Sequence, residues 1–175
     1  MYLDGAETER LKIRQLIMSD VDTWALFFNN NPSLDYLGLD LSLDSDTQAK
    51  DWIERQLWRY ENGKFGHHAL IEKSTNRFIG QCGLLTQELD GLEVIEIGYH
   101  ILPEFWGKGY ATEAAQLFRN FAFENKICQS LVSIIDVRNK ASQRVAEKNG
   151  MLKGPQVKYY DLDVFIYRIN KPIGL

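Results

Sequence analysis

The residues best suited to chemistry lie in the segment 103–114, which reads PEFWGKGYATEA. It follows the apolar run 94–102 and opens an amphipathic stretch, 111–126. A strand, a glycine-containing loop and a helix in this order form an anion cradle, because the first helical turn has unpaired N–H donors and a partial positive charge. Gly107 and Gly109 lack a Cβ atom, so a phosphate can come close to the backbone. The segment therefore predicts a site for a phosphate-bearing ligand.

Two common phosphate-binding motifs do not match this loop. The nucleoside-triphosphate P-loop needs G-x-x-x-x-G-K-[ST], whereas Lys108 lies between the two glycines and Tyr110 follows Gly109. The dinucleotide fingerprint needs G-x-G-x-x-G, and counting from Gly107 its third glycine position holds Thr112. A nicotinamide-binding oxidoreductase is therefore only a distant alternative.

A second motif lies downstream, and its combination with the glycine-containing loop is more specific than the loop alone. The strand-like run 129–137 is followed by Asn139, by Ser142 three residues later, and by a short helical segment ending in Glu-Lys-Asn-Gly at 147–150. Together the two motifs resemble the GNAT superfamily of N-acetyltransferases. The resemblance covers residues 8–170 and is strongest to the RimJ/RimL-type branch, which contains the ribosomal-protein N-terminal alanine and serine acetyltransferases.

The resemblance assigns the coenzyme site. It implies that the pyrophosphate of acetyl-CoA binds the loop and helix start, mainly through backbone N–H groups, and that Lys108 adds charge nearby. Trp106 stands where the family commonly has Gln or Arg. It also implies that a bulge, expected at Gly98, separates two strands to admit the thioester, and that a backbone N–H near residues 99–101 stabilises the oxyanion. The residues assigned to coenzyme binding are Tyr99, His100, Ile101, Trp106, Gly107, Lys108, Gly109, Tyr110, Ala111, Thr112, Asn139 and Ser142.

Glu96 is the candidate general base. An alkyl ammonium has a pKa near 10, so the acceptor amine must lose a proton before it can attack. Glu96 lies within an apolar strand, where burial raises the pKa of a carboxyl group, and it alternates with Gly98 and His100 on one strand face. The alternatives are a purely structural role for Glu96, and His100 as the base.

Ser142 is the candidate acid that protonates the departing thiolate. Many family members use a tyrosine in the short helix, but that position holds Ala146 here. The resemblance to the ribosomal-protein branch assigns the role to Ser142. Its hydroxyl could instead cap the short helix, and Tyr159 and Tyr160 are other donors to consider.

Acceptor specificity is expected from the loop 29–46. Acidic and aromatic residues in this loop could attract a cationic amine, or they could simply be a solvated surface. These residues are Asp35, Tyr36, Asp40, Asp44 and Asp46.

Composition narrows the class of protein. The chain has 175 residues, 45% hydrophobic and 25% charged, which predicts one globular domain. The resemblance implies that residues 1–175 are a single acyl-CoA N-acyltransferase domain. A formal net charge of −4 with no basic run argues against nucleic acid as a partner. No apolar stretch reaches about 18 residues, and the start does not resemble a signal peptide, so a cytoplasmic protein is expected. Cys82 and Cys128 lack metal-ligand spacing and are expected to be reduced thiols. The neighbouring histidines His67 and His68 are not expected to bind a metal.

Hydrophobic periodicity predicts an α/β (α+β) fold. Ser19 is expected to cap a first helix, and a capping box of Ser45 and Gln48 is expected to start a second. Asp90-Gly91 predicts a tight hairpin turn. The order of these elements predicts a mixed α/β sheet, and the resemblance implies a GNAT-like, mostly antiparallel sheet of about seven strands flanked by four helices. The expected strands include 8–16, 65–73, 77–89, 92–102, 129–137 and 163–170.

The sequence therefore predicts an N-acetyltransferase without a metal. It would move the acetyl group of acetyl-CoA to a primary amine, either a protein N-terminus or a small molecule, by direct attack in a ternary complex. The alternative is a non-catalytic acyl-CoA-binding or sensor module on the same fold. The aromatic content is compatible with a monomer or a homodimer.

Overall fold

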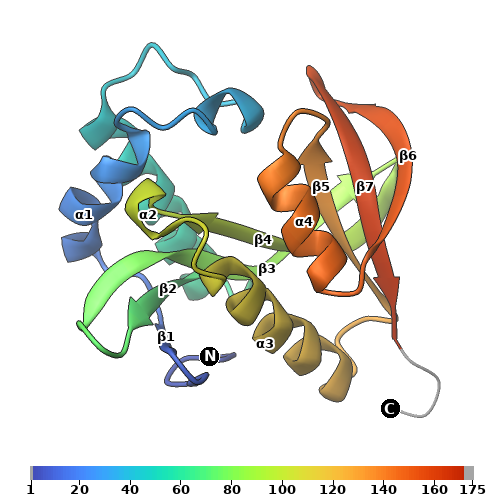
Figure 1. The fold of residues 1–175 in the computed structure, drawn as a ribbon, viewed down its shortest axis with the longest axis horizontal. Helices are drawn as coiled ribbons and strands as arrows, with labels where there is room; N and C mark the ends of the chain where they lie inside the picture. The colour runs from blue at the N-terminus through green and yellow to red at the C-terminus, as the bar shows by residue number, and fades with distance from the viewer. Residues whose placement is uncertain (1, 172–175) are drawn as a thin grey trace.

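Seven strands form one sheet in the order β1-β2-β3-β4-β5-β7-β6 (Figure 1). Alternating polar and apolar residues favour these strands, and turn residues separate them. This computed structural model describes residues 2–171, so residue 1 and residues 172–175 of the predicted domain lie outside it. Adjacent strands are antiparallel except β4 and β5, which run parallel, so the prediction of a mixed, mostly antiparallel sheet with four helices is confirmed. The strands are β1 (Leu11–Arg14), β2 (His67–Glu72), β3 (Arg77–Leu89), β4 (Leu92–Ile101), β5 (Ser130–Asp136), β6 (Leu152–Tyr159) and β7 (Leu162–Asn170). The helices are α1 (Val21–Ala25), α2 (Ser45–Glu61), α3 (Tyr110–Glu124) and α4 (Lys140–Lys148).

The turn at Asp90 and Gly91 builds the central hairpin. Both residues have positive φ, 51° and 74°, which is the conformation that a two-residue turn between twisted strands requires. β3 and β4 then pair in unbroken register from Leu89 and Leu92 to Gly80 and Ile101. The predicted hairpin is confirmed.

β4 and β5 separate after a short parallel contact. They pair only at Ile95 with Leu131 and at Glu96 with Val132. The Ser133 hydroxyl then donates to the Ile97 carbonyl (2.9 Å), taking the place of a strand partner. The strands therefore diverge, as expected, and open the sheet between them.

The bulge predicted at Gly98 is wrong, because the register of β4 with β3 continues through this residue. A glycine is needed there for another reason. A Cβ atom at Gly98 would lie 2.7 Å from Nε2 of His67, so the missing side chain makes room for the imidazole.

Helices cover both faces of the sheet (Figure 1). The neighbours His67 and His68 point to opposite faces, as β geometry predicts. The His67 ring stacks on Trp52 of α2 at 5.8 Å, whereas the His68 ring packs against Phe118 of α3, also at 5.8 Å. Both histidines are buried, so α2 and α3 lie on opposite sides of β2.

Three predicted boundaries were wrong because local polar contacts overrode periodicity. Asp44, not Ser45, caps α2, since its carboxylate accepts from both the backbone N–H (2.9 Å) and the hydroxyl (2.7 Å) of Thr47. The first helix is not capped by Ser19; it is preceded by a 3-10 turn whose Asp20 binds Arg14 through two hydrogen bonds (2.6 and 2.7 Å). β1 is shorter than 8–16.

None of the helices in residues 2–171 has the length and apolarity needed to cross a bilayer.

Candidate active site

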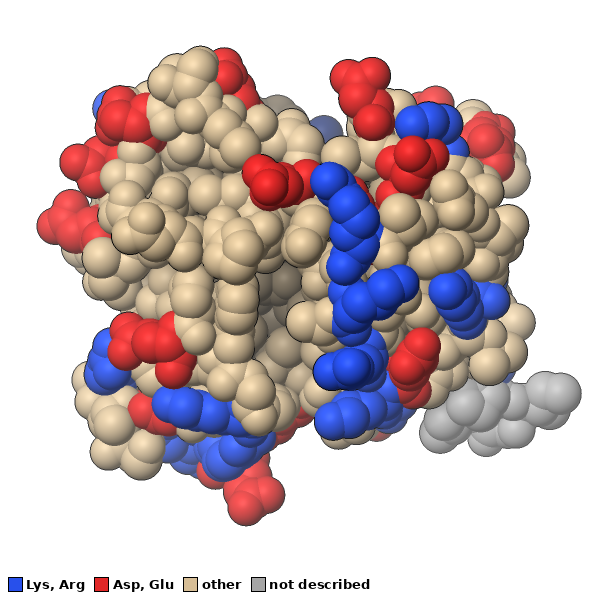
Figure 2. Space-filling view, turned by 45° about the horizontal axis from the view of Figure 1, so that its top comes forward, with Lys and Arg blue, Asp and Glu red and all other residues tan. Residues whose placement is uncertain are grey.

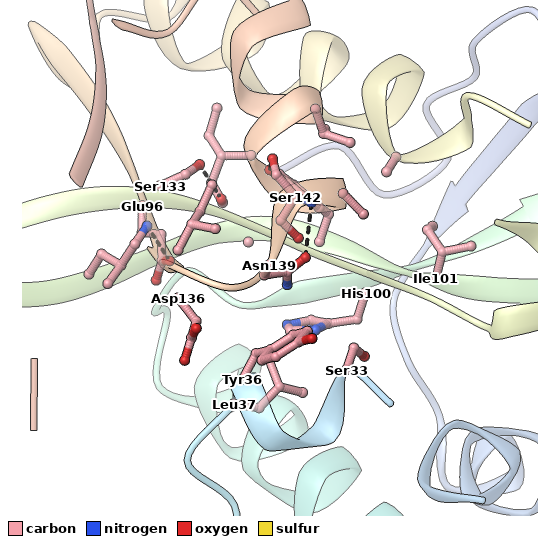
Figure 3. Close-up of a pocket in the computed structure, with 18 of the residues that line it drawn as sticks. Ser33, Tyr36, Leu37, Glu96, His100, Ile101, Ser133, Asp136, Asn139 and Ser142 are labelled. Atoms are coloured by element: carbon pink, nitrogen blue, oxygen red, sulfur yellow. Dashed lines mark hydrogen bonds between the residues drawn. The ribbon is translucent and has the colours of Figure 1, made fainter. Parts of the chain in front are cut away.

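The separation of β4 and β5 produces a cleft of about 790 Å³. α2 and the loop before it form one wall, and the start of α3 together with α4 forms the other. Figure 3 shows Glu96, His100 and Ile101 along one strand, Asn139 and Ser142 at the start of a helix, and Ser33, Tyr36 and Leu37 approaching from the opposite side. The cleft therefore brings together the two motifs found in the sequence.

The loop before α3 forms an anion cradle at one end of this cleft. Gly107 and Gly109 have φ of 76° and 83°, a conformation that glycine adopts without strain. Glu113 makes the first backbone bond of the helix, donating its N–H to the Gly109 carbonyl (3.1 Å). Among the residues described, none of the backbone N–H groups named next donates to a backbone carbonyl outside the helix, so they are left to bind an anion. They belong to Gly107, Gly109, Tyr110, Ala111 and Thr112.

Arg10 is a part of the cradle that the sequence did not reveal. Its Nε donates to Oε2 of Glu113 (2.6 Å), and its Nη1 donates to the Lys108 carbonyl (2.8 Å). The guanidinium therefore fixes the loop to the helix and places positive charge beside Gly109. About a hundred residues separate the partners, so no local pattern could have indicated this contact.

Trp106 and Lys108 lie near the cradle without supplying a charge inside the cleft. The Trp106 indole N–H donates to the Ile101 carbonyl (2.6 Å), so this side chain holds the loop against the end of β4. The Lys108 ammonium packs over the Phe105 ring at 4.7 Å, and its side chain does not line the cleft. Gly107 and Gly109 of this loop line the cleft, whereas Lys108, which was predicted to add charge there, does not.

The next part of the wall is the C-terminal half of β4, where Tyr99, His100 and Ile101 all line the cleft. Within residues 2–171, β4 has no strand pairing on its β5 side beyond Glu96, and after the Ser133 contact to Ile97 its edge is open to an extended ligand. The Tyr99 hydroxyl donates to the Ser142 carbonyl (2.8 Å) and links the strand to α4.

His100 is enclosed by aromatic rings. Its imidazole lies 4.9 Å from the Trp52 ring and 5.1 Å from the His67 ring. Burial lowers the pKa of His100 to about 4, so the ring is neutral at pH 7. His67 is neutral for the same reason, and within residues 2–171 neither of its ring nitrogens has a hydrogen-bond partner.

Asn139, and not Ser142, caps the short helix α4, which contradicts the alternative that the Ser142 hydroxyl is the cap. The Asn139 side chain caps α4, since its Oδ1 accepts from the Ser142 backbone N–H (3.1 Å; Figure 3). Ser142 is therefore not the cap, and in the described part of the chain its hydroxyl has no hydrogen-bond partner. The hydroxyl is left available to a ligand in the cleft. Ala146, where many family members have tyrosine, is fully buried.

Glu96 lies half-buried on the floor of the cleft without a cationic partner. Its Oε2 accepts from the Gln87 amide (2.7 Å) and its Oε1 from the Ile134 N–H (3.3 Å). Burial raises the pKa of the Glu96 carboxyl above its ordinary value, and the two hydrogen bonds only partly oppose this. The Tyr159 hydroxyl donates to Oε1 of Gln87 (3.3 Å), which places Tyr159 beside the carboxylate network. Tyr160 is 84% exposed.

Asp40 and Asp44 in the loop 29–46 stabilise local turns of this segment. Asp40 accepts from the Ser42 hydroxyl (2.6 Å), and Asp44 caps α2. Of the five residues singled out there, only Tyr36 lines the cleft. Its ring lies 5.1 Å from the Arg138 guanidinium, and Arg138 in turn pairs with the buried Asp136 (2.7 Å). For Asp40 and Asp44 the alternative of a solvated turn holds.

Figure 2 shows a row of Lys and Arg side chains along one edge of the hollow in this face of the molecule. Among the residues that the structure describes, negative charge within the cleft is confined to Glu96 and Asp136. The cationic residues that line the cleft are Arg55, Arg59, Arg138, Lys140, Arg144 and Lys148.

In residues 2–171 no group of three or more His, Cys, Asp or Glu side chains could hold a metal ion.

Residues 10–152 match the family model of the acetyltransferase (GNAT) domain. The chain belongs to the GNAT family. It is an acetyl-CoA-dependent N-acetyltransferase, which confirms the class of enzyme predicted from the two motifs.

A curated relative and two solved structures support this assignment. YkkB of Bacillus subtilis, a protein named as uncharacterized, is 33% identical over 166 residues, covering 91% of this chain and 92% of its own. An acetyltransferase from Agrobacterium tumefaciens is 27% identical with a TM-score of 0.79, covering 97% of this chain and 96% of that one. RimL, a ribosomal L7/L12 α-N-protein acetyltransferase solved with coenzyme A, shares the fold with a TM-score of 0.78 at 19% identity, covering 95% and 97%.

Proposed function

We propose that this GNAT enzyme transfers an acetyl group from acetyl-CoA to a primary amine by direct attack within a ternary complex. One observation carries the proposal: the anion cradle and the Glu96 carboxylate lie at two ends of a single cleft. From Glu96 to Ile101 the strand advances five residues, about 17 Å, at about 3.3 Å per residue. A phosphate at the cradle and an amine at Glu96 are thus separated by a distance that the pantetheine arm of the coenzyme has to span.

The residues act in a defined order along this path. The Glu96 carboxylate accepts the proton of the acceptor ammonium, directly or through a water. The nitrogen lone pair then forms a bond to the thioester carbonyl carbon. An N–H of the open β4 edge stabilises the charge that develops on the carbonyl oxygen. The C–S bond breaks and its electron pair stays on sulfur. The amide nitrogen loses its second proton, which passes through water to the Ser142 oxygen as the Ser142 hydroxyl gives its own proton to the thiolate.

Asn139 positions the second half of the site. Its Oδ1 is engaged by the first turn of α4, while its amide nitrogen has no partner within residues 2–171. That N–H₂ group is left to donate to the amide carbonyls of the pantetheine arm. The same residue therefore starts the helix that carries Ser142 and holds the substrate beside it.

The acceptor is proposed to be a protein N-terminus or a small primary amine. The experiment is to follow thiol release from acetyl-CoA with a panel of N-terminal peptides, amino acids, polyamines and aminoglycosides. Release with one class identifies the acceptor. Binding of coenzyme A by calorimetry without thiol release from any acceptor would support the sensor alternative and contradict the proposal.

A further inference from the structure

The acceptor end of the cleft contains two arginines that no carboxylate neutralises. Arg55 and Arg59 are four residues apart on α2 and so lie on one helix face, and both line the cleft. In residues 2–171 no carboxylate oxygen lies within 4.0 Å of either guanidinium. Four other arginines are paired with carboxylates, namely Arg10, Arg14, Arg77 and Arg138.

Arg59 is held in place although its charge is uncompensated. It is half-buried, and its Nη1 donates to Oε1 of Gln56 (3.3 Å). Gln56 is itself 2% exposed and accepts from the His67 backbone N–H (2.9 Å), so the contact is anchored to β2. Burial and the neighbouring Arg55 both lower the pKa of Arg59. A partly buried cation without a partner is unfavourable, and a bound anion would relieve this.

The coenzyme phosphates do not account for this pair. Their cradle is the loop 107–112, which has its own backbone donors and Arg10. Arg59 is anchored instead, through Gln56, to His67 of β2. The His67 ring lies beside Gly98, two residues from Glu96 on β4. Arg59 and Glu96 therefore offer one cationic and one anionic position at the place where the acceptor enters.

We propose that the acceptor carries a carboxylate close to its reactive amine, and that Arg59, assisted by Arg55, binds this carboxylate while Glu96 receives the amine. This inference rests on the proposed function and narrows its substrate class. Arginine matches a carboxylate through two parallel N–H···O bonds, which would fix the orientation of the acceptor. An amino acid or a peptide N-terminus with a nearby acidic group has this chemistry. Polyamines and aminoglycosides, which carry several positive charges, would be repelled.

The test compares acceptors that differ only in this charge. Each amino acid or short peptide with a free carboxylate is compared with its own amide. Spermidine is included as a polycationic acceptor. For every acceptor, kcat/KM is measured by thiol release. We expect the carboxylate-bearing member of the productive pair to be favoured about 10- to 100-fold. Arg59→Gln should bring the ratio of kcat/KM for the acid to kcat/KM for its amide close to one. Arg59→Lys should retain part of the preference, and Arg55→Gln should reduce it less.

Lys50→Gln is the matched control, because Lys50 lies on the same helix, pairs with Glu54 (3.8 Å) and does not line the cleft. An equal rate with acids and amides, a preference for spermidine, or an equal loss for both members in Arg59→Gln would overturn the inference. A preference of the native enzyme for succinyl-CoA over acetyl-CoA that is lost in Arg59→Gln would also overturn the inference, because Arg55 and Arg59 would then bind the acyl group and not the acceptor. Absence of turnover with every acceptor would instead contradict the proposed function, and calorimetric titration of the acid and amide pair onto the CoA-bound enzyme would still decide the charge preference.

Discussion

The proposed coenzyme end and the proposed acceptor end of the cleft are built in different ways. The coenzyme end uses two continuous segments, 99–112 and 139–142, and its main donors are backbone N–H groups. The acceptor end uses single side chains from α2, β2, β3, β4 and β6, which meet only in the folded protein. The first end is suited to a constant ligand and the second to a ligand that differs between enzymes. This difference predicts that substitutions at the two ends separate coenzyme affinity from turnover.

The largest effect is expected from Glu96→Gln. Glutamine keeps the shape and can still accept from the Ile134 N–H, but it cannot take a proton. We expect kcat to fall by about 100-fold or more, with coenzyme A affinity unchanged by calorimetry. A variant with unaltered kcat would assign Glu96 to structure.

The pH dependence sharpens this prediction. Because burial raises the pKa of Glu96, the acid limb of the kcat/KM profile should lie above the ordinary pKa of a glutamate, about 4.3, and should disappear in Glu96→Gln. A carboxyl whose pKa is higher in the folded protein loses stability as pH rises between its unfolded and folded pKa values. Glu96→Gln should therefore have an equal or higher Tm at pH 7, and a clear loss of Tm would show a structural need for the carboxylate.

At the coenzyme end, Gly109→Ala should weaken coenzyme A binding. Its φ of 83° is strained for alanine by about 1–2 kcal/mol, which corresponds to about a 5- to 30-fold loss if relaxation displaces the cradle. Gly91→Ala is the matched control, because Gly91 has a φ of 74° and lies in a hairpin turn outside the cleft. Calorimetry should show weaker binding only for Gly109→Ala, and an equal change in both variants would contradict a role for the cradle.

Ser142→Ala is expected to lower kcat by about 10-fold. The effect is smaller than the usual range of general acid catalysis because a thiol has a pKa near 8.5 and leaves readily as a thiolate. Since Ser142 does not cap α4, Tm and coenzyme A affinity should stay unchanged. Full activity in this variant would remove Ser142 from the mechanism.

The smallest effect is expected from Asn139, where cap and ligand contact can be separated. Asn139→Ala should lower the free energy of unfolding by about 1 kcal/mol, because α4 loses its cap, and should also weaken coenzyme binding. Asn139→Asp keeps the cap oxygen but loses the amide donor, so it should weaken binding without loss of stability. Equal unfolding free energies for the alanine variant and the native protein by urea denaturation would contradict the capping role.

Much of the fold could be predicted because its signals are local. The turn at Asp90-Gly91, the opposite faces of His67 and His68, and the start of α3 after Gly109 each depend on a few neighbouring residues. The errors arose where a side chain competed with the periodic pattern. Asp44 displaced Ser45 as a cap, and the gap between β4 and β5 needed no bulge at Gly98 because Ser133 takes over the Ile97 carbonyl.

The sequence by itself determined the family, the order of the elements and the loop that forms the anion cradle, because backbone donors follow from glycines and a helix start. Only the tertiary structure decided which charges meet in the cleft. It left the acidic loop residues Asp40 and Asp44 in local turns, brought Arg10 against the loop of the cradle, and placed Arg55 and Arg59 in the same cleft as Glu96. Contacts between residues far apart in the chain depend on how the strands pair and how the helices pack over them, which no local spacing encodes.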